Sequence, residues 1–142
     1  MTRLFLLLIA VLAAAPPAAA GEGAPPRRIR LKLLSYNVHQ GAEASAAVLG
    51  RFIQGIGADI VSLQEVPTVQ YRDQTARAAG YANVSRYDRG KAIFSRTAIE
   101  EEEVLPLPFD RSLIRVTTAV DGVALSIYGV HISWDVDGNQ QA

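Results

Sequence analysis

The spacing of apolar residues switches repeatedly along the chain between the period of a strand and that of a helix. The resulting order of segments restricts the possible folds more than any other feature of the sequence. Residues 28–38 (RIRLKLLSYNV) alternate basic and apolar side chains and then become mostly apolar, as a strand does when it enters a core. Residues 43–57 place apolar side chains at helical spacing and end in glycines that favour a helix stop. Residues 58–66 (ADIVSLQEV) form a second apolar run, and residues 69–80 predict a second helix that ends at a glycine.

Three further strand-like runs follow, at residues 91–96, 112–120 and 123–133. The last two are separated by Asp121-Gly122, a pair that is typical of a tight hairpin. The predicted order is therefore β-α-β-α followed by several strands, which is an α/β or α+β layered fold. Residues 100–103, four glutamates, are expected on a solvated edge or loop, where their charge discourages edge pairing.

The first twenty residues are typical of a secretory signal peptide. Arg3 precedes an apolar run over residues 4–15, and Ala18 and Ala20 fit the small-residue rule for cleavage. The run is about a dozen residues long, against the ~20 that span a bilayer, so an uncleaved membrane anchor is the weaker alternative. We therefore expect export to a periplasm or to the outside, and no stable membrane anchor. The predicted organisation is a signal peptide (1–20), a polar linker (21–28) and one domain (29–142).

Composition narrows the class of protein. The formal net charge is zero and the charges of both signs are mixed along the chain. No clustered basic patch for nucleic acid is evident, because neutralising phosphates requires grouped Lys and Arg. The sequence contains no cysteine, so an exported chain of this kind is held together by packing alone. The roughly 120 residues after the signal are enough for one modest core.

Polar side chains follow the ends of the predicted strands, where ligands gather in layered α/β folds. Asn37 and His39 follow the first strand, Gln64 and Glu65 the second, and His131 lies in the last. Each has an ordinary explanation taken alone: a turn residue, a solvated charge or a hydrogen-bonded core histidine. Together, a carboxylate and an amide on neighbouring strand ends make a partial shell for a hard cation such as magnesium, which takes few protein ligands.

A weaker metal pattern lies near the end of the chain. Asp135, Asp137 and Asn139 alternate in a way that is typical of a calcium loop, but the bidentate glutamate further on is missing. We therefore do not place the metal there.

Four segments, LLSYNVHQG, ADIVSLQEV, GKAIFSR and YGVHIS, occur in an order that resembles the endonuclease/exonuclease/phosphatase superfamily. That fold is shared by deoxyribonuclease I-like nucleases, exonuclease III-like repair enzymes, inositol polyphosphate phosphatases and bacterial sphingomyelinases. The resemblance covers residues 31–133. It implies the first half of a four-layer α/β β-sandwich, a mixed sheet with helices on its outer face. It also implies the hydrolysis of a phosphoester with Mg²⁺, or with Mn²⁺ or Ca²⁺, as cofactor.

The resemblance also implies a role for each site residue. Glu65 would be the principal metal ligand, Asn37 would lie in the metal and phosphate site, and Gln64 would support Glu65 without touching the metal. His131 would be the catalytic histidine that contacts the scissile phosphate. Arg111 and His39 would be phosphate-binding candidates.

The sequence departs from the family pattern in three places. It contains neither Gly-Asp-x-Asn nor the later Ser-Asp-His that supplies the general base, and it has Lys91 where many relatives carry asparagine. We therefore expect a truncated product whose sheet has one uncovered face and whose activity is low or absent. The alternatives are a non-catalytic fragment or pseudoenzyme of this fold, or a small secreted α/β binding domain. The class of phosphate ester and the oligomeric state stay open.

Overall fold

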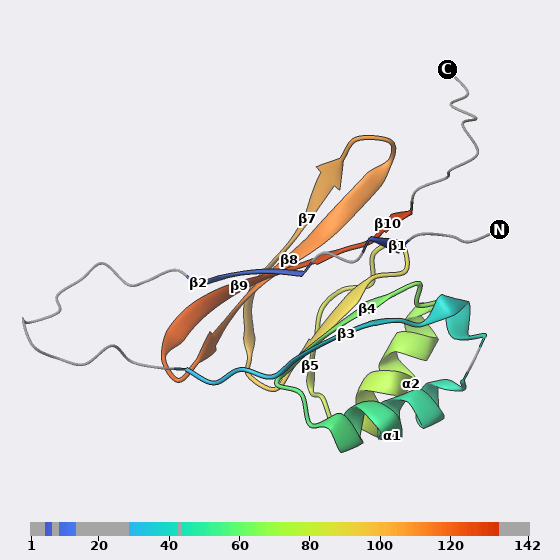
Figure 1. The fold of residues 1–142 in the computed structure, drawn as a ribbon, viewed down its shortest axis with the longest axis horizontal. Helices are drawn as coiled ribbons and strands as arrows, with labels where there is room; N and C mark the ends of the chain where they lie inside the picture. The colour runs from blue at the N-terminus through green and yellow to red at the C-terminus, as the bar shows by residue number, and fades with distance from the viewer. Residues whose placement is uncertain (1–4, 7–8, 14–28, 43, 134–142) are drawn as a thin grey trace, which may run out of the picture.

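The computed structural model describes residues 5–6, 9–13, 29–42 and 44–133 (Figure 1). In this part of the chain no helix is long and apolar enough to cross a membrane. The helices and strands, in chain order, are β1 (Phe5–Leu6), β2 (Ile9–Ala13), β3 (Leu33–Asn37), η1 (His39–Gly41), α1 (Ala46–Ile56), β4 (Ile60–Gln64), α2 (Val69–Ala79), β5 (Asn83–Val84), β6 (Ala92–Ser95), β7 (Ile99–Leu107), β8 (Arg111–Val120), β9 (Val123–Val130) and β10 (Ile132–Ser133).

The described strands form two four-stranded sheets and one short two-stranded ladder. The first sheet has the order β3-β4-β6-β5, the second has the order β2-β9-β8-β7, and β1 pairs with β10. Figure 1 shows α1 and α2 on one side of the first sheet and the second sheet on its other side. Strands β3 and β4 are parallel, whereas β4 and β6 are antiparallel. The predicted layered α+β fold, with a mixed sheet and helices outside, is confirmed.

Each side of the first sheet has its own apolar core. Between this sheet and the helices lie buried side chains that include Leu63 and Phe94 of the strands and Ile53 of α1. Between the two sheets lie Ile60, Ile93, Ile114, Val116, Leu125 and Ile127. The expectation that one sheet face would be uncovered is therefore wrong, because residues on β8 and β9 cover it.

Both predicted helices form and both end where the sequence indicated. The Ser45 hydroxyl accepts a hydrogen bond from the Val48 backbone N–H at the start of α1, and the Thr68 hydroxyl does the same for Tyr71 at the start of α2. These contacts satisfy N–H groups that a helix leaves without an internal partner. At the other ends, the helices stop at glycines in the left-handed conformation.

The later strands match the sequence pattern with two additions. Asp121 and Gly122 both have positive φ, 51° and 76°, as a two-residue hairpin of type I′ requires. The glutamates 100–103 belong to the edge strand β7, so the expected solvated edge is confirmed. On the outer face Glu103 pairs with Arg115 at 3.0 Å. The two additions are the short strand β5 and the long strand β7, neither of which was among the predicted strands. Strand β3 begins at Leu33 rather than at residue 28.

At the N-terminal side, β2 pairs antiparallel with β9, from Ile9 opposite Gly129 to Ala13 opposite Leu125. The expected cleavage site and linker, residues 14–28, and the acidic run at residues 135–139 lie outside the described residues. The signal peptide stays a prediction.

Candidate metal and phosphate site

Asn37 and Glu65 meet at the carboxyl ends of the parallel strands β3 and β4. The register places Asn37 opposite Gln64, so the residue after β4 lies beside the end of β3. The Asn37 side-chain N–H donates to Glu65 Oε1 at 2.9 Å. The Asn37 Oδ1 accepts the backbone N–H of His39 at 2.8 Å, which fixes the orientation of the amide. The two residues named as metal ligands from the sequence are therefore in direct contact.

The backbone of Glu65 is held in an uncommon conformation. Its φ is +53°, in the left-handed region that a non-glycine residue adopts at a cost. Its carbonyl accepts the Gln40 N–H at 3.0 Å, and the next N–H, of Val66, donates to the Gly90 carbonyl at 2.9 Å. A Cβ on Gly90 would lie 3.4 Å from the Glu65 Cα. The loop before β6 and the turn after β3 thus fix the carboxylate from two sides.

His131 reaches the same carboxylate from the second sheet. Its Nε2 lies 3.4 Å from Glu65 Oε1. Burial is the largest cause that lowers the pKa of His131 below 6.5; the charges of Lys91 and Arg111 lower it further, whereas Glu65 raises it. His131 is therefore mainly neutral at pH 7 and does not neutralise the Glu65 carboxylate, whose side chain is only 14 % exposed.

Gln64 points into the layer between the sheets and is 1 % exposed. Its side-chain amide donates to the hydroxyls of Ser35 and Ser62 and to the Ser62 carbonyl, at 3.1–3.3 Å. Its Oε1 has no hydrogen-bond partner among the described residues. The hydrogen bonds of Gln64 run to these serines and not to Glu65, so it supports the end of β4 through the neighbouring strand.

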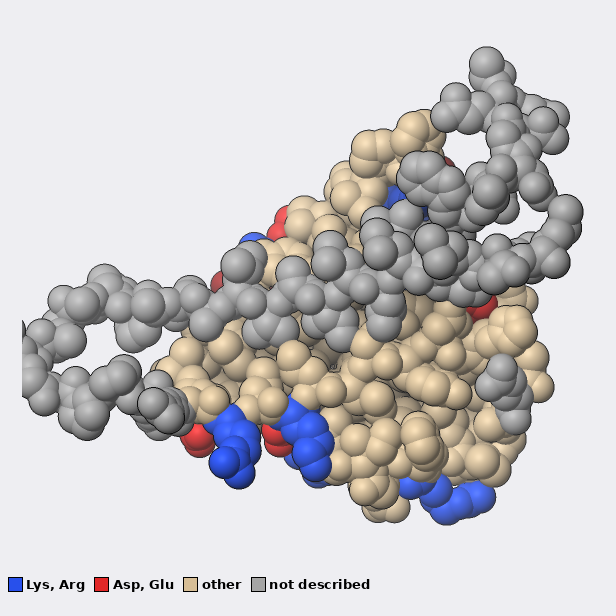
Figure 2. All heavy atoms as spheres, viewed as in Figure 1, with Lys and Arg blue, Asp and Glu red and all other residues tan. Residues whose placement is uncertain are grey.

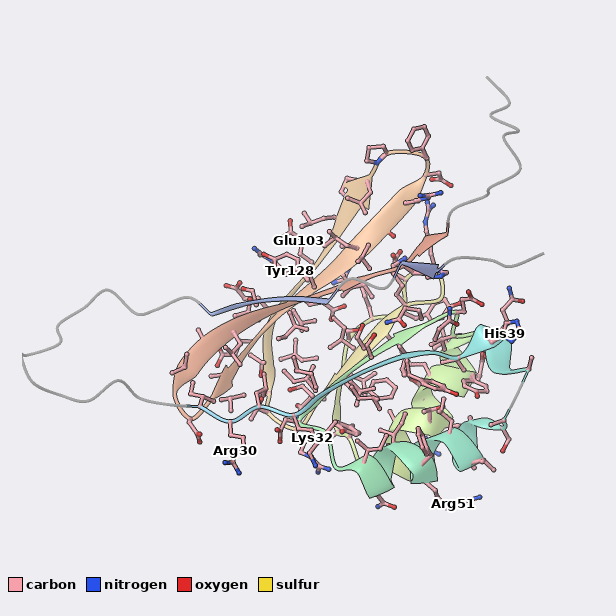
Figure 3. All side chains as sticks on the ribbon, viewed as in Figure 1. Arg30, Lys32, His39, Arg51, Glu103 and Tyr128 are labelled. Atoms are coloured by element: carbon pink, nitrogen blue, oxygen red, sulfur yellow. The ribbon has the colours of Figure 1, made fainter. Side chains whose placement is uncertain are left out.

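The two phosphate-binding candidates, Arg111 and His39, occupy different positions relative to the site. Arg111 is the first residue of β8, and its charge acts on His131. His39 belongs to η1, is exposed, and has a φ of +50°. Figure 3 places His39 at the η1 turn, beyond the end of β3. The structure thus joins Asn37, Glu65 and His131 directly, with Arg111 in electrostatic range and His39 on the solvent side.

A second charged cluster beside the site was not anticipated as a unit. The Lys91 Nζ lies 3.2 Å from Asp88 Oδ2, and the Ser112 hydroxyl donates to the same oxygen. Arg89, in the same loop, pairs with Asp110 at 2.8 Å. The loop that contacts Glu65 is therefore tied to β8 and to the β7–β8 turn. Nothing in the local sequence indicates this cluster, because a charged residue next to a strand is usually solvated.

Lowering the pH is expected to remove the contribution of Asp88 to stability. Burial alone would raise the pKa of Asp88, but hydrogen bonds from Ser112 and Lys91 lower it below its usual 3.8. A carboxyl group with a depressed folded pKa stabilises the fold above its unfolded pKa, and this stabilisation is lost as the pH falls through the folded value. The difference in unfolding free energy between wild type and Asp88→Asn should be largest near pH 7 and shrink below about pH 4.

Urea unfolding at several pH values measures this difference. The matched control is Asp73→Asn, because the Asp73 carboxylate on α2 is 48 % exposed where it pairs with Arg72, and carboxylates that face solvent contribute little through such pairs. A wild-type advantage over Asp88→Asn that stays constant from pH 7 to pH 3 would contradict the assignment.

The residues at the site fit a hydrated hard cation with few protein ligands. Within the described residues there is no group of three or more His, Cys, Asp and Glu placed to share a metal. Glu65 supplies a mostly buried carboxylate whose charge His131 does not neutralise at pH 7, and Asn37 supplies an amide beside it. One carboxylate with a neighbouring amide suits Mg²⁺, which keeps several waters. Glu65 and Asn37 are the residues that would hold the ion.

The protein is a layered α+β protein in which two sheets pack face to face with the helices outside. Polar strand ends from both sheets converge on one carboxylate and form a candidate phosphoester site. Residues 34–140, well over half of the chain, match the model of the Endonuclease/Exonuclease/phosphatase family. The chain belongs to this family, and the resemblance seen in the sequence is confirmed. At family level this means phosphoester hydrolysis, by nucleases and phosphatases that generally depend on a divalent metal. A search of curated proteins found no match.

Proposed function

We propose that this chain carries the metal-binding and phosphate-binding side of a divalent-metal-dependent phosphoester hydrolase. The observation that supports this most is the convergence of Asn37, Glu65 and His131 from three strand ends on two different sheets. A structural role alone does not require a mostly buried carboxylate beside a neutral histidine, because such a charge is stabilising only when it is compensated. A bound cation compensates it.

The chemistry follows from the geometry of these side chains. Glu65 and Asn37 hold the ion, which when bound supplies a Lewis acid for the phosphate oxygens. His131 is mainly neutral at pH 7, so its ring can exchange a hydrogen bond or a proton with a phosphate oxygen. The charge of Arg111, which acts on His131, is proposed to meet the same phosphate, and charges fixed in advance reduce the reorganisation needed during reaction.

The substrate is proposed as a phosphate ester outside the cytoplasm, with no dependence on a nucleic-acid groove. On the face shown in Figure 2, the visible Lys and Arg side chains stand apart from one another, mostly along the lower edge. The zero formal net charge is consistent with this proposal. The export signal predicted from the sequence supports an extracytoplasmic location.

Removing the metal tests the proposal. Because the sequence lacks the Ser-Asp-His that supplies the general base, hydrolysis of bis(4-nitrophenyl) phosphate is expected to be slow. A chelator should abolish this slow hydrolysis and added Mg²⁺ or Mn²⁺ should restore it, because no protein group replaces the ion as a Lewis acid. Ion binding is measured alongside by calorimetry. Binding of Mn²⁺ and phosphate without turnover would identify the non-catalytic alternative. A chain that binds neither would be a binding domain of another kind.

A further inference from the structure

Lys91 lies at the same end of the first sheet as Asn37 and Glu65. Strand β6 is antiparallel to β4, with Ala92 opposite Leu63. Continuing this register by one residue places Lys91 opposite Gln64, which is itself opposite Asn37. Because side chains alternate along a strand, Lys91 shares the face of Ile93, which belongs to the core between the sheets. Three adjacent strands therefore present polar side chains in one row on the inner face.

The ammonium group of Lys91 is fixed between the sheets. The residue is 5 % exposed, and its Nζ lies 3.2 Å from Asp88 Oδ2. Asp88 also accepts the hydroxyl of Ser112, which comes from the inner face of β8. A lysine with this little exposure keeps its charge only with a partner. The ion pair thus anchors a positive charge at the start of β6, in the row that includes Gln64 and Asn37.

This charge acts on the site. Lys91 directly follows the loop residue Gly90, whose carbonyl accepts the Val66 N–H and whose Cβ, if present, would lie 3.4 Å from the Glu65 Cα. A buried positive charge opposes the binding of a second cation and favours an anion, and the effect is stronger away from water. Lys91 is therefore expected to weaken the binding of the metal and to strengthen the binding of the phosphate.

We propose that Lys91 is a phosphate-binding residue of this site, held in place by Asp88, and that its charge makes the binding of metal and phosphate interdependent. The proposal rests on the proposed function, since it assumes that metal and phosphate share the site. Without phosphate, Lys91 weakens the binding of the cation. With phosphate present, the anion compensates both positive charges and the two ligands bind together.

The test measures Mn²⁺ and inorganic phosphate binding to the full chain and to Lys91→Met by calorimetry. Expected changes are on the order of tenfold and opposite in sign, with tighter Mn²⁺ binding in phosphate-free buffer and weaker phosphate binding in the presence of Mn²⁺. A merely structural role would move both affinities in the same direction. Lys32→Met is the matched control, because Lys32 is the other lysine of the chain, is exposed, and bonds the Ile56 carbonyl at the opposite end of β3.

A second measurement does not require the Lys91 variant to fold. Wild-type protein labelled with ¹³C at the lysine Cε gives one NMR signal for each of its two lysines. Lys32→Met removes one of them and so assigns the other. We expect inorganic phosphate, added with Mn²⁺ replaced by diamagnetic Mg²⁺, to shift the Lys91 signal and leave the Lys32 signal in place.

The outcomes separate this proposal from the proposed function. The role of Lys91 is overturned if Lys91→Met binds phosphate as wild type does, or if its affinities for Mn²⁺ and for phosphate both fall. In either case, Mg²⁺-dependent hydrolysis by the wild-type protein would still support the proposed function. Opposite shifts in a protein that hydrolyses no ester support Lys91 and overturn the hydrolase. A wild-type chain that binds neither ligand overturns both.

Discussion

Replacing Glu65 with glutamine is expected to weaken Mg²⁺ or Mn²⁺ binding on the order of 100-fold or more, because it removes the one carboxylate of the proposed metal shell. Hydrolysis of a phosphodiester should disappear with the ion. The substitution keeps the size of the side chain, and an amide oxygen can still accept the Asn37 N–H that now bonds Glu65 Oε1 at 2.9 Å. The change is therefore one of charge and not of shape.

The stability of Glu65→Gln separates a metal ligand from a structural carboxylate. The Glu65 side chain is 14 % exposed, and glutamine keeps its size and can still accept the Asn37 N–H, so the substitution removes no packing or hydrogen bond from the metal-free protein. We expect unfolding in urea without metal to show equal or higher stability for the variant, and the stabilisation that wild type gains from added Mn²⁺ to be lost.

Glu103→Gln is the matched control for this experiment. Glu103 is exposed on the edge strand β7 and pairs with Arg115 at 3.0 Å, far along the chain from the site. Its variant should bind Mn²⁺ as wild type does, since an exposed ion pair contributes little. Undiminished Mn²⁺ binding in Glu65→Gln would contradict the metal site and, with it, the proposed function.

The sequence predicted the parts of the fold that depend on local patterns. Both helices were predicted because a helical pattern ends in each case at a glycine, and Asp121-Gly122 predicted its hairpin because few pairs adopt positive φ at both positions. The contact between Asn37 and Glu65 was also predictable, since parallel neighbouring strands end at one edge.

The sequence could not predict features that depend on contacts between distant segments. The covering of the first sheet by β8 and β9 was missed, because a buried apolar run does not say which surface buries it. The cluster of Asp88, Lys91 and Ser112 was missed for a similar reason: twenty-four residues separate Asp88 from Ser112, and only the packing of the two sheets brings them together. Charged residues next to strands are usually solvated, so burial of Lys91 had no local signal.

The contact between the two helices leads to the last prediction. Gly50 lies on the face of α1 that packs against α2, where a Cβ would lie 2.4 Å from the Ala78 Cβ and 2.7 Å from the Thr75 carbonyl. Both distances are far shorter than real contacts, and the second involves backbone that cannot rotate away. Gly50→Ala is therefore expected to lower the unfolding free energy by about 1–3 kcal/mol, the usual range for overpacking, although alanine is the better helix former.

Gly55→Ala, in the last turn of the same helix, is the matched control. A Cβ there would meet nothing within 4 Å, so only the helix propensity changes and stability should rise by roughly 0.5 kcal/mol. Urea unfolding without metal ions shows directly whether each substitution raises or lowers the unfolding free energy. If Gly50→Ala were as stabilising as Gly55→Ala, α1 and α2 would not be in backbone contact. Changes of opposite sign in the unfolding free energy would instead show that close packing requires the glycine in the middle of α1. They would also show that α2, which follows β4 and the proposed metal ligand Glu65, is held against α1.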